Sequence, residues 1–156
     1  MIEADVKILN ALMRACSLGE LCTYDVVRRL ERRAAVDGGA ILAKLKEDGY
    51  VDDARYAGAF ARDKSALAGW GPARIRTALR LKGIDESLIG EALNSVDSDA
   101  AEKKMRMVLE NKWKTLSRQE DGSKKQAKFI RFALSRGYSY IQAIEFYDSI
   151  RTNKRD

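Results

Sequence analysis

Arginine and lysine are the side chains of this sequence that are best placed to do chemistry, because they are concentrated in two blocks. Residues 54–82 contain seven basic residues and a single acid, and residues 103–156 contain 14 basic residues and six acids. Residues 83–102 contain six acids and no base, and residues 1–53 carry a net charge of −2. Blocks of positive charge attract polyanions or acidic protein surfaces, and salt screens this attraction.

The spacing of the basic residues predicts two faces that could contact such a partner. Arg76 and Arg80 are four positions apart, which places both on one side of a helix, and a guanidinium can donate two parallel hydrogen bonds to a phosphate or a carboxylate. Lys124, Lys128 and Arg131 follow the same rule, with spacings of four and three. For each single charge the alternative is an ordinary solvated surface, since an isolated surface charge adds little stability.

Acids and thiols, the other residues with chemical potential, have structural explanations. Asp52 and Asp53 stand where a helix is expected to begin, so we interpret them as capping residues rather than metal ligands. Cys16 and Cys22 are the only cysteines, and histidine is absent. Two thiols alone are a poor ligand set for zinc, and we expect them to be small buried side chains in a reducing compartment.

Two further motifs have both a functional and a structural interpretation. The Gly71–Pro72 turn at a helix start could hold a phosphate, but it lacks the additional glycines and the Lys-Ser/Thr ending of a phosphate-binding loop. Phe129 and Phe132 could stack on bases, although at helical spacing they are more often core residues. No set of residues resembles a catalytic site, so we predict a protein that is not an enzyme and uses no cofactor or metal.

Helices must position these residues, because the sequence has one proline and is rich in Ala, Leu, Lys, Arg and Glu. Hydrophobic periodicity predicts nine helices, which start near residues 3, 23, 37, 52, 72, 85, 98, 123 and 139. The expected capping residues are Thr23, Asp37, the pair Ser123 and Gln126, and the pair Ser139 and Gln142.

A recurring junction between helices predicts an internal repeat. Ala35-Val36-Asp37, Gly83-Ile84-Asp85 and Gly137-Tyr138-Ser139 each read small, apolar, N-cap, and they follow one another after 48 and 54 residues. Six and ten positions past the small residue stand further residues suited to a core: Ile41 and Leu45, Ile89 and Leu93, and Ala143 and Tyr147. Val36 with Ile41 and Ile84 with Ile89 are expected to form hydrophobic staples.

The repeat predicts an all-α fold of three tandem three-helix repeats, which cover residues 1–50, 51–96 and 97–156. Such repeats stack into an elongated, curved helical array that binds extended partners along one face. In the third repeat we expect a longer first helix and a polar loop over residues 117–123. The alternative is chance similarity between amphipathic helices.

The sequence also indicates where the protein works. No apolar run approaches the roughly 20 residues that a membrane-spanning helix needs. Glu3 and Asp5 stand where a signal peptide would carry positive charge. We therefore expect a cytoplasmic monomer that does not contact a membrane.

Three stretches resemble the RecX family of recombination regulators. Residues 49–57, Gly-Tyr-Val-Asp-Asp-Ala-Arg-Tyr-Ala, are similar to the family's glycine–aromatic–Asp–aromatic–Ala stretch. Residues 71–75, followed by Leu79 and residues 82–84, resemble its Gly-x-x-x-Ile…Leu…Lys-Gly-Ile segment. Residues 132–140 resemble its C-terminal Arg-Gly-aromatic motif. No single stretch is decisive for the family, but the order and spacing of the three stretches are fairly specific for it.

The resemblance implies tandem three-helix repeats and a partner, the RecA recombinase filament on single-stranded DNA. It also implies binding in the filament groove and damping of ATP hydrolysis and strand exchange in recombination and DNA repair. Transferred to the matching helices, the expected partner- or DNA-binding residues are Arg62, Lys64, Arg74, Arg76, Arg80, Lys82, Lys124, Lys128 and Arg131. Residues 1–50 match the family pattern least. Because their net charge is negative, it stays open whether they contact DNA or the filament.

Two other functions remain open on the sequence alone. A general nucleic-acid-binding helical module, independent of RecA, would bind bare DNA tightly and lose affinity steeply as salt rises. A helical adaptor for an acidic protein would use the same positive charges. Short helix pairs also resemble helix-turn-helix units, but no amide-rich recognition helix is present.

Overall fold

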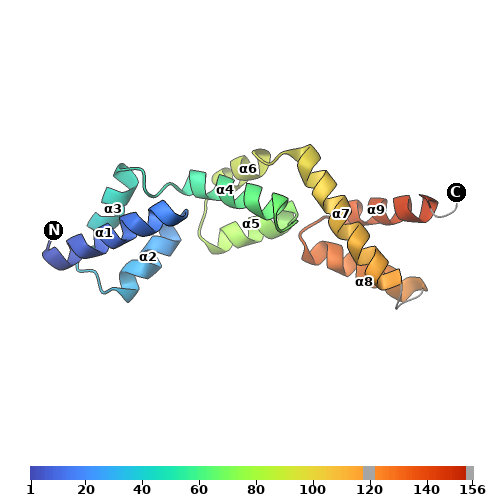
Figure 1. Ribbon diagram of the computed structural model, residues 1–156, viewed down its shortest axis with the longest axis horizontal. Helices are drawn as coiled ribbons and strands as arrows, with labels where there is room; N and C mark the ends of the chain where they lie inside the picture. The colour runs from blue at the N-terminus through green and yellow to red at the C-terminus, as the bar shows by residue number, and fades with distance from the viewer. Residues whose placement is uncertain (118–121, 154–156) are drawn as a thin grey trace. The chain divides into compact units, whose positions relative to one another are not determined.

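The computed structural model describes residues 1–117 and 122–153, and within these residues the chain forms nine α-helices and no strand (Figure 1). The helices are α1 (Glu3–Leu18), α2 (Thr23–Arg32), α3 (Gly38–Glu47), α4 (Asp53–Ala66), α5 (Pro72–Leu81), α6 (Glu86–Asn94), α7 (Ser98–Ser117), α8 (Gly122–Ser135) and α9 (Tyr140–Asn153). The predicted all-α fold is confirmed. Most of the polar loop expected over residues 117–123 lies outside the described residues. None of the described helices is both long and apolar enough to cross a membrane.

The first compact unit comprises residues Met1–Ala59 together with Leu79–Ala92. Helices α1, α2 and α3 form its main core, which contains the buried side chains of Leu12, Val26, Leu30, Ile41, Leu45 and Val51. A spacing of four residues places Val26 with Leu30, and Ile41 with Leu45, on one side of their helices. Each such side chain stabilises the fold by about 1.5–3 kcal/mol when it is fully buried.

The second compact unit comprises Phe60–Ala78 and the described residues from Leu93 onward. Its core lies among α7, α8 and α9 and is built on aromatic rings. The ring of Trp113 meets those of Phe129 and Tyr147 edge-to-face, with centroids 5.5 Å apart in both pairs, a geometry that aromatic rings prefer. Phe129 is fully buried, so it is a core residue, as expected, and offers no surface for stacking on a base.

The repeated junctions are present, with one change of register. Ala35, Ile84 and Tyr138 each donate their backbone N–H to the carbonyl five residues earlier, and each follows a residue with positive φ. This pattern is the Schellman helix end. Ala34, at a φ of 52°, therefore takes the position that glycine takes in the other two junctions. Since Ala35 is the structural equivalent of Ile84, Val36 is an additional residue.

The predicted staple between Val36 and Ile41 is consequently wrong. Ile41 is fully buried, but the side chain of Val36 is 74% exposed. The buried carboxylate of Asp5 explains this conformation, because it accepts the backbone N–H groups of Val36 at 3.0 Å and of Asp37 at 2.9 Å. Those bonds hold the linker with the valine side chain toward solvent.

Two of the predicted helix N-caps are present, and a third is wrong. Asp37 caps α3 by accepting from the Ala40 N–H at 3.0 Å, and the Ser139–Gln142 capping box is present, with bonds of 2.9 and 3.0 Å. Thr23 is not an N-cap, since α2 begins at Thr23 itself. Its N–H donates to the carboxylate of Asp53 at 2.8 Å, a residue too distant in sequence to be expected there.

The expected capping box at the start of α8 is also wrong. Helix α8 begins at Gly122, so Ser123 lies within its first turn and not before it. Gly122 has a φ of 54°, a conformation that glycine adopts without strain. With Ser123 as N-cap the helix would begin at residue 124, so it starts two residues earlier than the Ser123–Gln126 pattern indicates.

Backbone hydrogen bonds join two loops of the second unit. The N–H of Gly71 donates to the carbonyl of Arg136 at 2.7 Å, and the N–H of Ala73 donates to the carbonyl of Gly137 at 3.1 Å. Ala73 is the second residue of α5, so the Gly137 carbonyl satisfies an amide that has no partner within that helix. Pro72 between them has no N–H to satisfy. The amides that a phosphate would need at this turn are thus bonded within the chain.

Side chains strengthen the same contact between the loops. The buried hydroxyl of Tyr138 donates to the carbonyl of Gly69, and the guanidinium of Arg136 lies 3.5 Å from the carbonyl of Ala68. Residues 68–73 and 135–138 are called the interlocked loops below.

We expect Gly71→Ala to destabilise the protein by about 2 kcal/mol, within the range for overpacking a tight contact. A Cβ at this position would lie 2.4 Å from the carbonyl oxygen of Gly137, and backbone atoms cannot move aside cheaply. Urea unfolding followed by circular dichroism measures the change.

Gly90→Ala is the matched control, because no atom lies within 4 Å of the Cβ that it adds inside α6. This substitution should stabilise the protein by about 0.5–1 kcal/mol, as alanine does in a helix interior. Similar effects of the two substitutions would contradict the close approach of the interlocked loops.

Candidate functional site

Lys64 and Arg74, two of the predicted contact residues, meet on the ring of Trp70. The Nζ of Lys64 lies 4.7 Å from the ring centroid and the Cζ of Arg74 lies 4.0 Å from it. The rings of Phe60 and Trp70 meet in a T-shaped arrangement with their centroids 6.1 Å apart, and Arg74 also reaches the carbonyl of Ser135 at 3.5 Å. Cation–π contacts of this kind contribute about 0.5–1 kcal/mol each at exposed sites. Two charges from different helices are thereby held against one ring.

Arg80 and Lys82, two more of the predicted residues, are paired with acids. Arg80 forms an ion pair with Glu86, and both side chains are more than half exposed. Lys82 forms an ion pair with Asp25, whose side chain is only 16% exposed. The hydrogen bond to Asp25 raises the pKa of Lys82 above its usual value. These two cations are partly neutralised within the chain, so they offer a partner less charge than the sequence alone indicates.

The remaining predicted residues lie at the surface of the second unit. Arg62 on α4 donates to the hydroxyl of Ser95 at 3.2 Å, and Arg76 on α5 is half-buried. Exposed positions on α8 are occupied by Lys124, Lys128 and Arg131. Helix α8 turns its buried residues, Phe129 and Ala133, into the core, so the basic residues lie on its solvent side. Contact with a partner remains a prediction for all nine residues.

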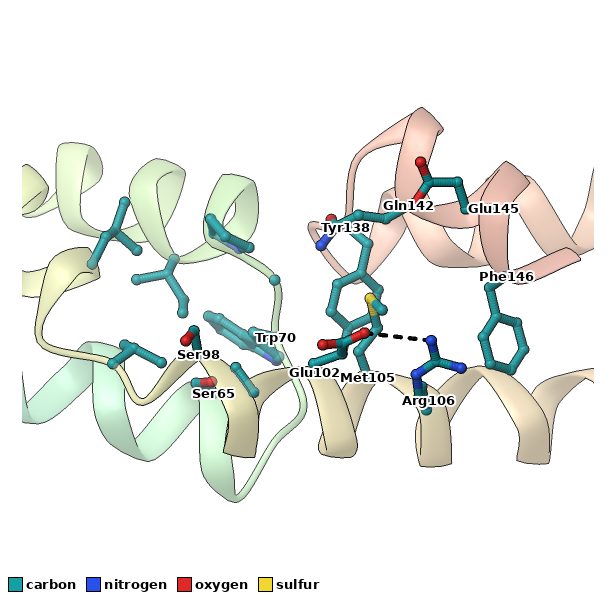
Figure 2. A pocket seen from close by; sticks show the side chains of 16 residues that line it. Ser65, Trp70, Ser98, Glu102, Met105, Arg106, Tyr138, Gln142, Glu145 and Phe146 are labelled. Atoms are coloured by element: carbon teal, nitrogen blue, oxygen red, sulfur yellow. Dashed lines mark hydrogen bonds and ion pairs between the residues drawn. The ribbon is translucent and has the colours of Figure 1, made fainter. Parts of the chain in front are cut away.

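Trp70 also lines a pocket of about 430 Å³ in the second unit (Figure 2). The figure shows Trp70 on the segment before α5, Met105 on α7 and Phe146 on α9. An ion pair between Glu102 and Arg106, 3.4 Å apart, lies among these apolar side chains. A pocket with this lining can hold an apolar side chain of a partner, since polar groups at a few points can fix its orientation. No sequence motif marked it, because several helices contribute to it.

Potential metal ligands are not grouped in the part of the chain that the structure describes. No set of three or more cysteine, aspartate or glutamate side chains there could hold a metal ion. Cys16 and Cys22 are free thiols, half-buried and buried respectively. Burial raises the pKa of the Cys22 thiol to about 11, which leaves it protonated at neutral pH. A protonated thiol is a weak nucleophile.

Asp25 is the centre of a polar cluster that sequence reasoning missed. Its carboxylate accepts from the backbone N–H of Cys22 at 3.2 Å, from the Cys22 thiol at 3.3 Å, and from the ammonium of Lys82. Burial raises the pKa of Asp25, but these hydrogen bonds lower it more, so the pKa lies below its usual value. The contacts with Cys22 are local, but the ion pair of Asp25 with Lys82 joins residues far apart in sequence, so no local signal could have revealed that pair.

We expect Asp25→Asn to lower the free energy of unfolding by about 1–2 kcal/mol at neutral pH, the lower part of the range for hydrogen bonds to charged groups. The pKa of Asp25 is lower in the folded than in the unfolded protein, so its contribution is complete above the unfolded pKa of about 3.9. The contribution is lost as the pH falls through the folded pKa. The difference between variant and parent in urea unfolding should therefore shrink in acid.

Asp48→Asn provides the control in the same unit. Asp48 pairs with Lys44 at 3.2 Å, but both side chains are substantially exposed. An exposed pair of this spacing contributes roughly 0.3–0.5 kcal/mol. If Asp25→Asn cost no more than Asp48→Asn, or if its cost did not change with pH, the proposed role of the Asp25 cluster would be wrong.

Together, the fold and the surface define a class: a helical-repeat protein whose exposed cations suit an acidic or polyanionic partner. Residues 52–93 match the family model of the second three-helix domain of RecX. Regulatory protein RecX of Pectobacterium atrosepticum is 34% identical over 134 residues, which cover 81% of this chain and 74% of that protein. Regulatory protein RecX of Clostridium botulinum (strain Eklund 17B) is 36% identical over 97 residues, but the match spans only 45% of its length.

A solved structure agrees with these matches. The crystal structure of a regulatory protein RecX superposes with a TM-score of 0.82 at 22% identity, over 94% of this chain and 72% of that one. The chain belongs to the RecX family. The resemblance found in the sequence is thereby confirmed, and with it the fold of three-helix units.

Proposed function

We propose that this protein binds the RecA recombinase filament on single-stranded DNA and lowers its ATP hydrolysis and strand exchange. Membership of the RecX family, whose compared members are regulatory proteins by name, is the observation that carries the proposal. In this proposal the protein works in the cytoplasm as a monomer, in recombination and DNA repair, and catalyses no reaction of its own.

The arrangement of charge supports this function. A filament on DNA is an extended partner, and helical repeats bind such partners along one face. Lys64 and Arg74 are held on Trp70, so they lose little conformational entropy when they bind. Lys124 and Arg131 are exposed on α8, where electrostatic attraction can speed association with a polyanion.

The direct test adds the purified protein to RecA filaments on single-stranded DNA and measures the rate of ATP hydrolysis and the length of the filaments. We expect both to fall as the protein concentration rises into the micromolar range. Unchanged hydrolysis and length would refute the proposal.

Charge reversal on α8 tests which surface is used. The double variant Lys124→Glu and Arg131→Glu should bind RecA-coated DNA about tenfold more weakly, mainly through slower association at low salt. Lys7→Glu with Arg14→Glu on α1 makes the same change in net charge on a helix that carries none of the predicted contact residues. Equal losses in the two variants would assign the effect to net charge and count against the α8 surface.

Comparing bare with RecA-coated DNA separates the proposed function from the alternatives. A filament regulator should bind the coated strand more tightly than the bare strand. Tight binding to bare DNA that RecA does not improve would favour a general nucleic-acid-binding module. Binding to RecA without DNA at the same affinity would favour an adaptor for an acidic protein.

A further inference from the structure

Helix α2 of the first unit carries a basic hollow that the family resemblance did not indicate. The hollow has a volume of about 320 Å³, and its charged or aromatic lining consists of Tyr24, Asp25, Arg28, Arg29, Arg32 and Lys82. We call it the α2 hollow. Four cations and one acid give it a local charge of +3, although residues 1–53 as a whole are negative.

The arginines share this hollow because of helical spacing. Asp25, Arg28, Arg29 and Arg32 follow one another at intervals of three, one and three residues, so they fall on one side of α2. Val26 and Leu30 are buried on another side, in the core of the first unit. The side chains that anchor α2 are thus separate from those that line the hollow.

The one acid of the hollow is already neutralised. Asp25 is ion-paired with Lys82, whereas Arg28, Arg29 and Arg32 have no ion pair within residues 1–117 and 122–153. Arg28 instead donates to the hydroxyl of Tyr24 at 2.9 Å, with its Cζ 5.5 Å from the centroid of that ring. Three guanidinium charges therefore face the hollow without a compensating carboxylate.

Helix-dipole stabilisation does not account for this arrangement. Arg29 and Arg32 lie in the last turn of α2, where a cation contributes about 0.3–1 kcal/mol. Lys44 and Lys46 lie in the last turn of α3, a helix of equal length in the same unit, and they do not line this hollow. The dipole explains a cation at a helix end, but it does not explain three arginines gathered beside an exposed aromatic ring.

We propose that the α2 hollow binds the phosphodiester backbone of single-stranded DNA directly. A guanidinium fork matches the geometry of a phosphate, and three forks in one hollow can follow successive phosphates. Tyr24 is 37% exposed beside them, and the charges of Arg28 and Lys82 lie 5.5 and 5.4 Å from its ring centroid. Basic grooves lined by aromatic rings are typical of single-strand binding. The inference rests on the proposed function only for the role of this contact within the filament.

The test measures binding of the full chain, without recombinase, to a fluorescein-labelled oligothymidylate of about 20 nucleotides, longer than the 4–16 nucleotides of a typical single-strand site. Fluorescence anisotropy gives the affinity at several salt concentrations between about 50 and 200 mM. Arg29→Gln with Arg32→Gln should bind about tenfold more weakly. The slope of log affinity against log salt is negative, and its magnitude should fall by about 1.4, because each phosphate contact contributes about 0.7 on a single strand.

Lys44→Gln with Lys46→Gln is the matched control, since it also removes two cations from the last turn of a ten-residue helix. It should change affinity less than twofold and leave the salt slope unchanged. Equal losses in the two double variants would overturn the proposal, because they would show an effect of net charge alone.

Two further measurements guard against misfolding and against another partner. The triple variant Arg28→Lys, Arg29→Lys and Arg32→Lys keeps the charge, so it should keep the salt slope of the parent. A slope as shallow as that of the glutamine variant would overturn the proposal.

Polyglutamate should displace the DNA far less well than unlabelled oligothymidylate at equal charge concentration, and equal displacement would indicate that the hollow binds an acidic protein instead. ATP hydrolysis by RecA filaments is measured separately, so an effect confined to that assay bears on the proposed function alone.

Discussion

The second unit depends on two peptide N–H groups, those of Gly71 and Ala73, which are bonded to the carbonyls of Arg136 and Gly137. An unpaired buried peptide group costs about 1–3 kcal/mol, so the two loops must meet in one register. That register fixes the first turn of α5 and hence places Arg74 on the ring of Trp70. The motif that begins at Gly71 and the Arg-Gly-aromatic motif at residues 136–138 are far apart in the sequence, but their backbones bind each other. The residues of the two motifs are therefore explained by this contact between backbones and not by a ligand site.

Positive charge on this scaffold takes three forms with different consequences. Lys64 and Arg74 are stacked on an aromatic ring, Arg80 is paired with an acid, and Lys124 on α8 is exposed. Stacked cations are oriented before they meet a partner, paired cations must first lose an existing interaction, and exposed cations act mainly on the rate of encounter. The net charge of a segment does not distinguish these forms, which is why a negatively charged segment can carry the basic α2 hollow.

Helices and many of their ends could be predicted from the sequence, because the signals are local: Asp37 and Ser139 cap the helices that follow them. The two cap errors are local: Cys22, whose N–H donates to Asp25, is the N-cap of α2 in place of Thr23, and α8 begins at Gly122 in place of following Ser123. The linker at Val36 was misassigned because a partner from elsewhere in the chain, the carboxylate of Asp5, binds its backbone. The pocket beside Trp70 and the Asp25–Lys82 pair could not be predicted for the same reason, since each exists only after tertiary packing. The basic residues were found by composition, but their individual partners were not.

The interlocked loops also affect the order in which the chain can fold during synthesis. Gly71 is synthesised about 65 residues before Arg136, whose carbonyl accepts its N–H. At translation rates of about 5–20 residues per second, the start of α5 waits roughly 3–13 s for its partner. The residues of the first unit, by contrast, are all synthesised by Ala92. Its core can therefore close while the second unit is still incomplete, and during that interval the N–H groups of Gly71 and Ala73 lack the carbonyls that they bind in the folded protein.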